Sequence, residues 1–427
     1  MFQKIKFNSS HLLLFFGVAV FIVNTITRMS ISQFIGFGPG KVIPYGDSIN
    51  FIAIGCVLGI ILLNFMKRPN ILIILFLPLY SLCVLYSNIN NKAGVAVFLT
   101  SVLPAFLLLC VKYNNLDITT VFKSFLKIYN LIIIVIFSLG IIDFFLHGII
   151  NEFIANHMST ESWATMIRTE NKVYGFRMIT VLGAPLMNAF YVLVFLILNK
   201  IYEHRFGIRL LNKYFLYGFS MVTIALTGSR SALLIALVYI AFAELFGRKK
   251  IIELIVIVIT LLLIFNSSLF KETIYSRFEL GFNNENDARY TLFENLKSNK
   301  YGEFGVLTGG GYNYSRTLTA SSSNSAVNFE YPVLMFLFDN GIIATSIYYL
   351  ITVFIPLIIL LRLRNINYLV GYLLIIVYLN LSNAIAQFYD FNMALAFLQI
   401  VLIYLARSQR SEENIKERPL IERSVTI

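Results

Sequence analysis

Apolar segments of 16 or more residues recur from one end of this 427-residue chain to the other, and this recurrence limits the possible folds more than any other feature. A helix needs about 20 mostly apolar residues to cross the hydrocarbon core of a bilayer. The chain has only 13% charged residues, whereas soluble domains carry roughly 25%. The sequence therefore excludes a soluble globular protein and predicts an all-α, polytopic integral membrane protein.

We expect about 12 transmembrane helices in one membrane domain that covers residues 1–427. The expected spans are residues 12–27, 49–66, 70–87, 93–111, 121–146, 178–199, 213–230, 231–247, 251–270, 333–360, 368–384 and 388–406. The first run follows Lys4 and Lys6, as in a signal peptide, but no small-x-small cleavage pattern comes after it. We interpret it as a retained helix. An even number of spans puts both termini on one side of the membrane.

The distribution of charge predicts which side this is. With the spans above, the side of the termini holds 21 Lys and Arg residues against eight Asp and Glu residues, and the opposite side holds 13 against 14. Cytoplasmic loops carry an excess of Lys and Arg. Both termini are therefore expected in the cytoplasm. The polar tail, residues 408–427, is expected to be a disordered cytoplasmic segment.

Two segments on the expected outer side are long enough to contribute a site. These are a first long loop, residues 147–177, and a large loop, residues 271–332, between the ninth and tenth spans. The large loop contains three consecutive glycines and a serine-rich stretch, a composition typical of loops with short helices. Any site built from these segments would face the extracytoplasmic side of the membrane.

Signatures of soluble enzymes are missing from the sequence. It has no Walker A loop, HExxH, GxSxG or dinucleotide fingerprint. The four histidines are scattered, and the three cysteines lie in apolar runs without a ligand-like spacing. We expect no metal, no cofactor and no nucleic-acid partner.

Three arginines at the expected outer edge of the membrane are candidates for binding a polyanion. Arg177 ends the first long loop, Arg230 lies in TGSRSALL between two apolar runs, and Arg289 lies in the large loop. The planar guanidinium group stays charged and binds phosphate oxygens through paired hydrogen bonds. The alternative is that these side chains reach lipid headgroups or pair with carboxylates, as interfacial arginines commonly do.

Other candidates lie in and after the large loop. Glu330 stands just before Pro332 at a plausible helix start, where its carboxylate is either a base or a salt-bridge partner. Gly309, Gly310 and Gly311 would let the backbone approach a sugar or phosphate closely, although glycine clusters are also common in plain loops. Tyr312 offers an aromatic face suited to a sugar ring, but aromatic belts occur in membrane proteins of every function.

Together these patterns resemble the O-antigen polymerase and O-antigen ligase superfamily of bacterial envelope glycosyltransferases. The resemblance rests on TGSRSALL around Arg230, on Arg289 followed after 19 residues by the three glycines, and on EYPVLMFLFDNGII beginning at Glu330. In the ligases a His-Asn pair stands eleven residues before a glycine. Here Glu330 occupies the position eleven residues before Gly341, and this departure favours a polymerase.

The resemblance implies a metal-independent glycosyltransferase of lipopolysaccharide biosynthesis in the bacterial inner membrane, with its active site facing the periplasm. Its partners would be an undecaprenyl-diphosphate-linked oligosaccharide, membrane lipids and, in some members, a chain-length regulator protein. Arg230, Arg289 and Glu330 would be catalytic, with Arg177 and Gly309–Tyr312 binding substrate. The alternatives are a ligase that transfers glycan to lipid A core and a flippase or transporter of the lipid-linked oligosaccharide.

Overall fold

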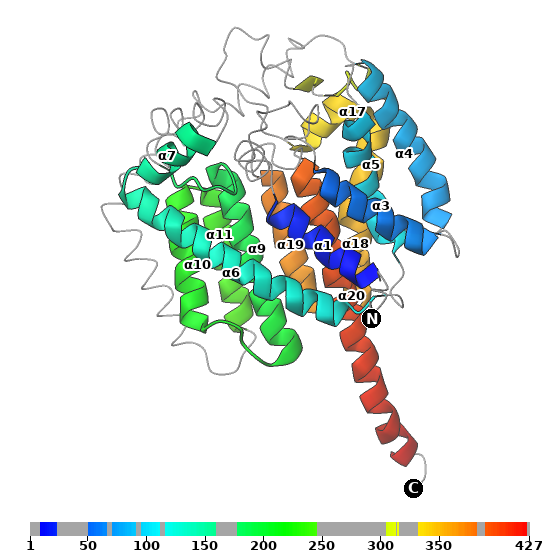
Figure 1. The fold of residues 1–427 in the computed structure, drawn as a ribbon. Coiled ribbons are helices and arrows are strands. Elements are labelled where there is room, and N and C mark those ends of the chain that lie inside the picture. Colours follow the sequence, from blue (N-terminus) through cyan, green and yellow to red (C-terminus); the bar gives the residue numbers. More distant parts are fainter. Residues whose placement is uncertain are drawn as a thin grey trace, which may run out of the picture.

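The apolar segments fold as helices that gather into one bundle (Figure 1). This computed structural model describes residues 9–23, 50–65, 71–90, 95–111, 116–158, 177–245, 305–312, 314–315, 332–381 and 389–424. The helices are α1 (Ser9–Phe21), α3 (Phe51–Phe65), α4 (Ile71–Asn90), α5 (Val95–Cys110), α6 (Ile118–Phe145), α7 (Ile149–Met158), α9 (Pro185–Phe206), α10 (Lys213–Thr227), α11 (Arg230–Leu245), α17 (Pro332–Tyr349), η4 (Leu350–Phe354), α18 (Ile355–Arg362), α19 (Ile366–Leu381) and α20 (Tyr389–Ser424). Among the described residues, the one departure from helix and loop is an isolated β-bridge between Thr180 and Gly183.

The all-α class is confirmed for this part of the chain. Every expected span overlaps a helix except residues 251–270, which lie outside the described residues. Five helical stretches are long and apolar enough to cross a membrane: Ile71–Ile89, Ile118–Phe145, Pro185–Phe206, Pro332–Arg362 and Phe391–Glu413. The helices α10 and α11 have only 15 and 16 residues, fewer than the roughly 20 that a perpendicular crossing needs. The expected number of 12 crossings stays a prediction.

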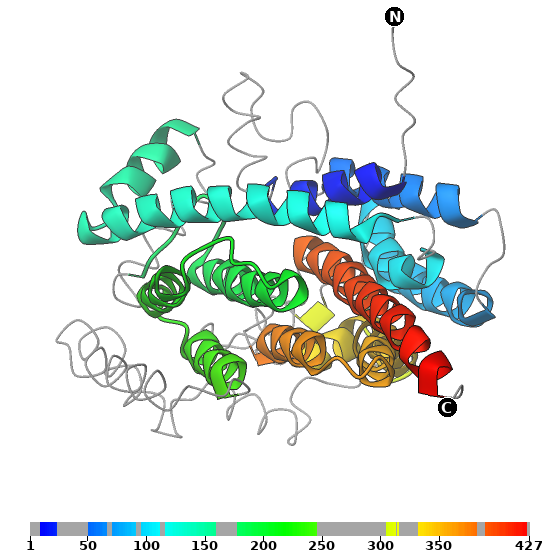
Figure 2. The same ribbon diagram turned by 90° about the horizontal axis from the view of Figure 1, so that it is seen from below.

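The centre of the bundle is formed by α9 and α20. In each, 83% of the most apolar window is buried, against 28% in α4 at the edge of the bundle. Aromatic rings fill the space around them: Phe397 of α20 packs on Phe125 of α6 with 4.6 Å between ring centroids, and Phe391 meets Phe190 of α9 edge-on at 4.9 Å. Figure 2 shows α6 running along one side of the bundle, with α1 next to it.

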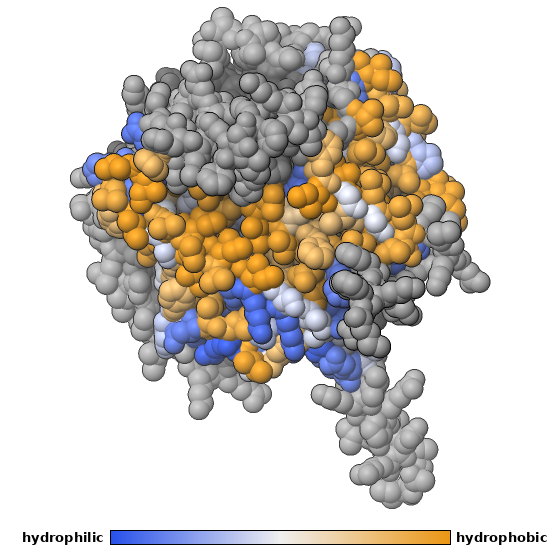
Figure 3. Space-filling model, in the orientation of Figure 1, coloured by the Kyte–Doolittle hydropathy of each residue, from blue (hydrophilic) through white to orange (hydrophobic). Residues whose placement is uncertain are grey.

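The outward-facing surface of the helices is apolar. On α4, large apolar side chains such as Ile71, Leu82 and Ile89 are about two-thirds exposed. Figure 3 shows apolar residues as a broad band across the middle of one face of the molecule, with hydrophilic residues gathered below it. Soluble monomers rarely expose an apolar surface of this extent, so the band is the part of the protein that lipid covers.

One end of the bundle, which we call the basic end, carries a group of cationic residues: Lys200, Arg205, Arg209, Lys213, Arg362, Arg364, Arg407 and Arg410. Contacts between distant segments hold this end together. Arg205 pairs with Glu412, Arg410 donates to the Arg362 carbonyl oxygen, and Lys213 pairs with Glu244. The opposite end carries the first residues of α9, α11, α17 and α20 (Figure 1). This arrangement agrees with spans that alternate in direction.

Two expectations about boundaries were wrong. The tail after Ser408 is helical as far as Ser424, because α20 continues beyond the membrane-length stretch. Hydrogen bonds from Ser408 to Glu412 and from Gln409 to Glu413 link successive turns of this polar extension. The helix expected from residue 178 begins at Pro185, since Gly183 has φ 146° and proline is favoured in the first turn of a helix.

Candidate functional site

Arg230 occupies the first position of α11 because TGSR forms a tight turn between two helices. Gly228 ends α10 with a left-handed φ of 67°, a conformation that favours glycine. The Ser229 hydroxyl accepts a hydrogen bond from the Ala232 amide at 3.4 Å, and the Ser229 carbonyl oxygen accepts the first helical bond, from Leu233. A serine at the N-cap therefore fixes where α11 begins, and Arg230 follows directly.

Arg177 reaches the same turn from the first long loop. Its Nε–H donates to the carbonyl oxygen of Thr227 at 2.9 Å, and the amide of Met178 donates to Leu226 at 2.9 Å. The carbonyl groups in the last turn of a helix carry partial negative charge, which favours a cation there. The guanidinium of Arg177 is thus held at the end of α10. Its partner there, Thr227, stands three residues before Arg230 in the chain.

The two arginines lie at the same turn. Arg177 is hydrogen-bonded to Thr227, the last residue of α10, and Arg230 begins α11 after only Gly228 and Ser229. Both side chains are half-buried. The structure therefore brings together two of the three predicted arginines, from segments about 50 residues apart, at the end of the bundle opposite the basic end.

Gly309, Gly310 and Gly311 do not lie at this turn, and the packing around them explains why they are glycines. The amides of Gly310 and Gly311 donate to the carbonyl oxygens of Phe338 and Asp339 at 2.7 and 3.0 Å. A Cβ atom on Gly309 would lie 2.5 Å from the Asp339 carbonyl oxygen, and one on Gly341 would lie 2.2 Å from that of Leu307. The close approach that these glycines permit is thus to the backbone of α17, which breaks at Gly341 with φ 76°. Substrate binding by them stays a prediction.

Tyr312 belongs to the same docked segment. Its amide donates to the Ser87 carbonyl oxygen of α4 at 3.1 Å, and the Ser87 hydroxyl donates to the Asp339 carbonyl oxygen at 2.9 Å. The carboxylate of Asp339 accepts a bond from the Ser315 amide at 2.7 Å. In Figure 1, α4 and α17 lie on one side of the bundle, and α10 and α11 on the other. The segment that contains Tyr312 is therefore separate from the turn that holds Arg230.

Two predicted catalytic residues, Arg289 and Glu330, lie outside the described residues. Their roles stay predictions. Within the part of the chain that the structure describes, no three histidine, cysteine, aspartate or glutamate side chains come together as metal ligands would.

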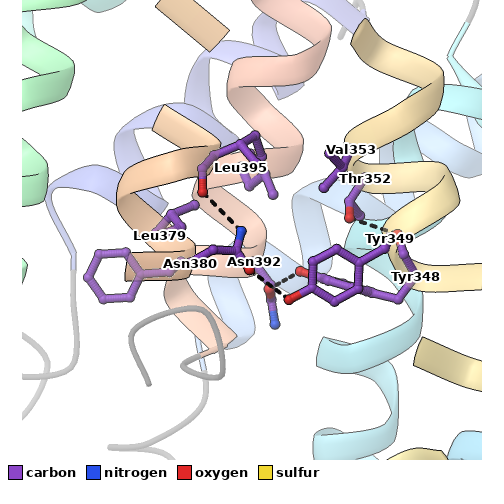
Figure 4. A pocket seen from close by; sticks show the side chains of 10 residues that line it. Tyr348, Tyr349, Thr352, Val353, Leu379, Asn380, Asn392 and Leu395 are labelled. Atoms are coloured by element: carbon purple, nitrogen blue, oxygen red, sulfur yellow. Dashed lines mark hydrogen bonds between the residues drawn. The ribbon is translucent and has the colours of Figure 1, made fainter. Parts of the chain in front are cut away.

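A pocket with several polar side chains in its lining, which the sequence analysis did not single out, lies between α17, η4, α19 and α20 (Figure 4). The Tyr348 hydroxyl donates to Asn392 Oδ1, and the Tyr349 hydroxyl donates to Asn380 Oδ1 at 2.8 Å. Asn380 Nδ2 donates in turn to the Ile376 carbonyl oxygen at 2.9 Å. Selecting only charged residues and histidines misses this set of tyrosines and asparagines. The sequence feature that could have indicated it is an asparagine within an apolar run, as at positions 380 and 392.

No protein-family model matches the chain, and neither does any curated protein or any solved structure. The candidate site is therefore defined by its own geometry. Its best-supported element is the pair Arg177 and Arg230, held at the turn between α10 and α11.

Proposed function

We propose that the chain is a polysaccharide polymerase of the bacterial inner membrane. It would transfer a growing glycan from undecaprenyl diphosphate to the distal sugar of another lipid-linked repeat unit at the periplasmic face. The observation that carries this proposal is the position of Arg177 and Arg230 at the turn between α10 and α11, where Arg177 is bonded to the last residue of α10 and Arg230 is the first residue of α11.

The chemistry of this turn favours an anion with several charges. Arg230 stands in the first turn of α11, where backbone N–H groups already contribute partial positive charge. A second guanidinium beside it adds to the positive potential, so a bound diphosphate would be stabilised by all three features. Two arginines also supply the paired hydrogen bonds that phosphate oxygens accept. The apolar band of the helices would accommodate the polyprenyl chain of the same substrate.

In the proposed reaction the hydroxyl oxygen of the acceptor sugar bonds to the anomeric carbon of the donor. The bond from that carbon to the diphosphate oxygen breaks, and its electron pair leaves with undecaprenyl diphosphate. Arg230, with Arg177 and Arg289, would stabilise the charge that develops on the leaving group. Glu330 would accept the hydroxyl proton or orient the hydroxyl; in the second case the proton leaves with the diphosphate.

A ligase would use the same donor and the same leaving group, so the acceptor distinguishes the two enzymes. Cells that lack a polymerase carry lipopolysaccharide with a single repeat unit. Cells that lack a ligase carry lipopolysaccharide with no repeat unit. A flippase would move the lipid-linked unit across the bilayer without lengthening its glycan. Each activity therefore gives a different product.

Reconstitution separates these possibilities directly. The purified full-length chain is placed in proteoliposomes with lipid-linked repeat units and no other enzyme, and the glycans are separated by length. We expect a ladder of products longer than one repeat and release of undecaprenyl diphosphate. Movement of the lipid across the bilayer without chain growth would overturn the proposal, and so would full-length chains on a strain from which this protein has been deleted.

A further inference from the structure

The segment that carries Arg177 is held from its other side by the junction of α6 and α7. We propose that Asn151, anchored by Asp143, is a positioning residue that sets the place of Arg177 relative to Arg230. This inference rests on the proposed function, because it concerns the same diphosphate site. Neither residue would touch the substrate.

The contacts of Asp143 fix Asn151 firmly. The Asp143 carboxylate accepts bonds from the amides of Ile150 and Asn151 at 2.6 and 3.3 Å, and from Asn151 Nδ2 at 2.5 Å. Asp143 and Asn151 are 2% and 7% exposed. A buried carboxylate is costly unless its oxygens are hydrogen-bonded, and here both oxygens accept bonds from the first turn of α7. The side chain of Asn151 is therefore held in one orientation.

Asn151 passes this constraint to the segment of Arg177. Its Nδ2 group also donates to the carbonyl oxygen of Ile179 at 2.7 Å. A side-chain amide has two N–H bonds, so these two acceptors, Asp143 and Ile179, use both. Ile179 lies two residues after Arg177, and its carbonyl is thereby fixed to the end of α6.

A second contact holds the same segment against α6. A Cβ atom on Gly140 would lie 2.8 Å from Thr180 Cγ2 and 3.3 Å from Met178 Sδ. Thr180 has little freedom to turn away, because its hydroxyl donates to Asn188 Oδ1 at 2.7 Å and accepts from the Leu182 amide at 3.1 Å. The segment thus rests directly on the backbone of α6 at this glycine.

The opposite edge of the segment contacts α10 through the bonds from Arg177 to Thr227 and from Met178 to Leu226. The segment is therefore clamped between the end of α6 on one side and the last turn of α10 on the other. Loss of the bond to Ile179 would let the segment move while Arg230 stays fixed by the Ser229 cap. A displacement of about 1 Å at a catalytic group can cost on the order of 10² in rate.

The test is a double-variant comparison in the reconstituted polymerase assay. Asn151→Leu keeps the branched shape of the side chain but removes both donors, and we expect kcat to fall on the order of 10² with a smaller change in KM. If Asn151 acts through Arg177, then Asn151→Leu combined with Arg177→Ala is no slower than Arg177→Ala alone. Independent, multiplying losses would show a general structural role and overturn the inference.

Gly140→Ala provides a second route that removes no polar group. It adds one methyl group against Thr180 and also favours the helix, so α6 is expected to form and the protein to reach normal membrane abundance. We expect the same fall in kcat and the same absence of a further loss with Arg177→Ala. A wild-type rate in both Asn151→Leu and Gly140→Ala would refute positioning while leaving the polymerase proposal intact. An inactive wild-type protein would instead refute the polymerase proposal.

Discussion

The ammonium group of Lys213, the first residue of α10, lies 2.7 Å from the carboxylate of Glu244 near the end of α11. Both side chains are almost fully buried, at 7% and 1% exposed. The Tyr217 hydroxyl donates to the second oxygen of Glu244, and Lys200 of α9 lies 3.6 Å from the same carboxylate. One buried carboxylate thus joins α9, α10 and α11 at the basic end, on the far side of these helices from the paired arginines.

Replacing this carboxylate is expected to destabilise the bundle. Glu244→Gln leaves the Lys213 ammonium buried without its counter-charge, and breaking a buried ion pair from one side costs about 3–5 kcal/mol. We expect a clear fall in the midpoint of thermal unfolding of the purified protein in detergent. The combined variant Glu244→Leu and Lys213→Met removes both charges and should recover most of the loss.

The matched control at the same end is Glu412→Gln. Glu412 pairs with Arg205 but is 53% exposed, and exposed pairs contribute only about 0–1 kcal/mol. If Glu412→Gln lowered the unfolding midpoint as much as Glu244→Gln does, burial would not explain the effect. The same conclusion would follow if the variant that combines Glu244→Leu with Lys213→Met were less stable than Glu244→Gln.

The positions of the helices could be predicted from the sequence because their main determinant is local. Apolar runs long enough for a bilayer became helices wherever the structure describes them, and Gly228 with Ser229 marked the turn between α10 and α11. The start of α9 was missed because Met178–Gly183 is as apolar as a helix but is held as a turn by contacts with other segments. The helical tail was missed because polarity alone was interpreted as disorder.

The candidate site could be predicted only in part. Sequence order put Arg177 and Arg230 on one side of the membrane, and the structure brings them to one helix turn. The contact of Asn151 with Ile179 joins uncharged groups 28 residues apart, and neither residue type nor spacing indicates it. The glycines looked like a loop open to ligand because no local pattern shows that their partner is the broken backbone at Gly341.

We expect Gly309→Ala to reduce stability and membrane abundance. Its φ is 75°, and an added Cβ atom would lie 2.5 Å from the Asp339 carbonyl oxygen and 2.6 Å from the Gly341 nitrogen. A strained backbone of this kind costs of order 1–3 kcal/mol, and the clash with backbone atoms adds to it. Gly218→Ala is the control, since nothing lies within 4 Å of a Cβ atom at that position on α10. Equal abundance of the two variants would contradict the tight docking of the glycine segment on α17.

The pocket between α17, η4, α19 and α20 predicts a coupling between two residues on different helices. Tyr349→Phe removes the donor to Asn380 Oδ1; both residues are half-buried, so the unpaired acceptor should cost less than the roughly 1–3 kcal/mol of a fully buried one. Asn380→Leu alone should cost a similar amount, because the Tyr349 hydroxyl then loses its acceptor. The double variant should be less destabilised than the sum of the two single variants. Strict additivity in thermal unfolding would show that this bond does not stabilise the packing of α17 against α19.

Arg230 is the residue whose replacement tests the proposed site most directly. Arg230→Ala removes one charged donor from a site proposed to stabilise a leaving diphosphate, and the loss of such a donor costs on the order of 10²–10³ in rate. Arg230→Lys keeps the charge but not the planar pair of donors, so we expect an intermediate rate.

Lys127→Ala, which removes an exposed cation from α6, controls for the change in net charge and should polymerise as the wild type does. The measurement is chain length and initial rate in proteoliposomes at matched protein abundance. A wild-type ladder from Arg230→Ala would remove the diphosphate site from this turn, and a rate for Arg230→Lys as low as that for Arg230→Ala would show that bidentate geometry matters more than charge.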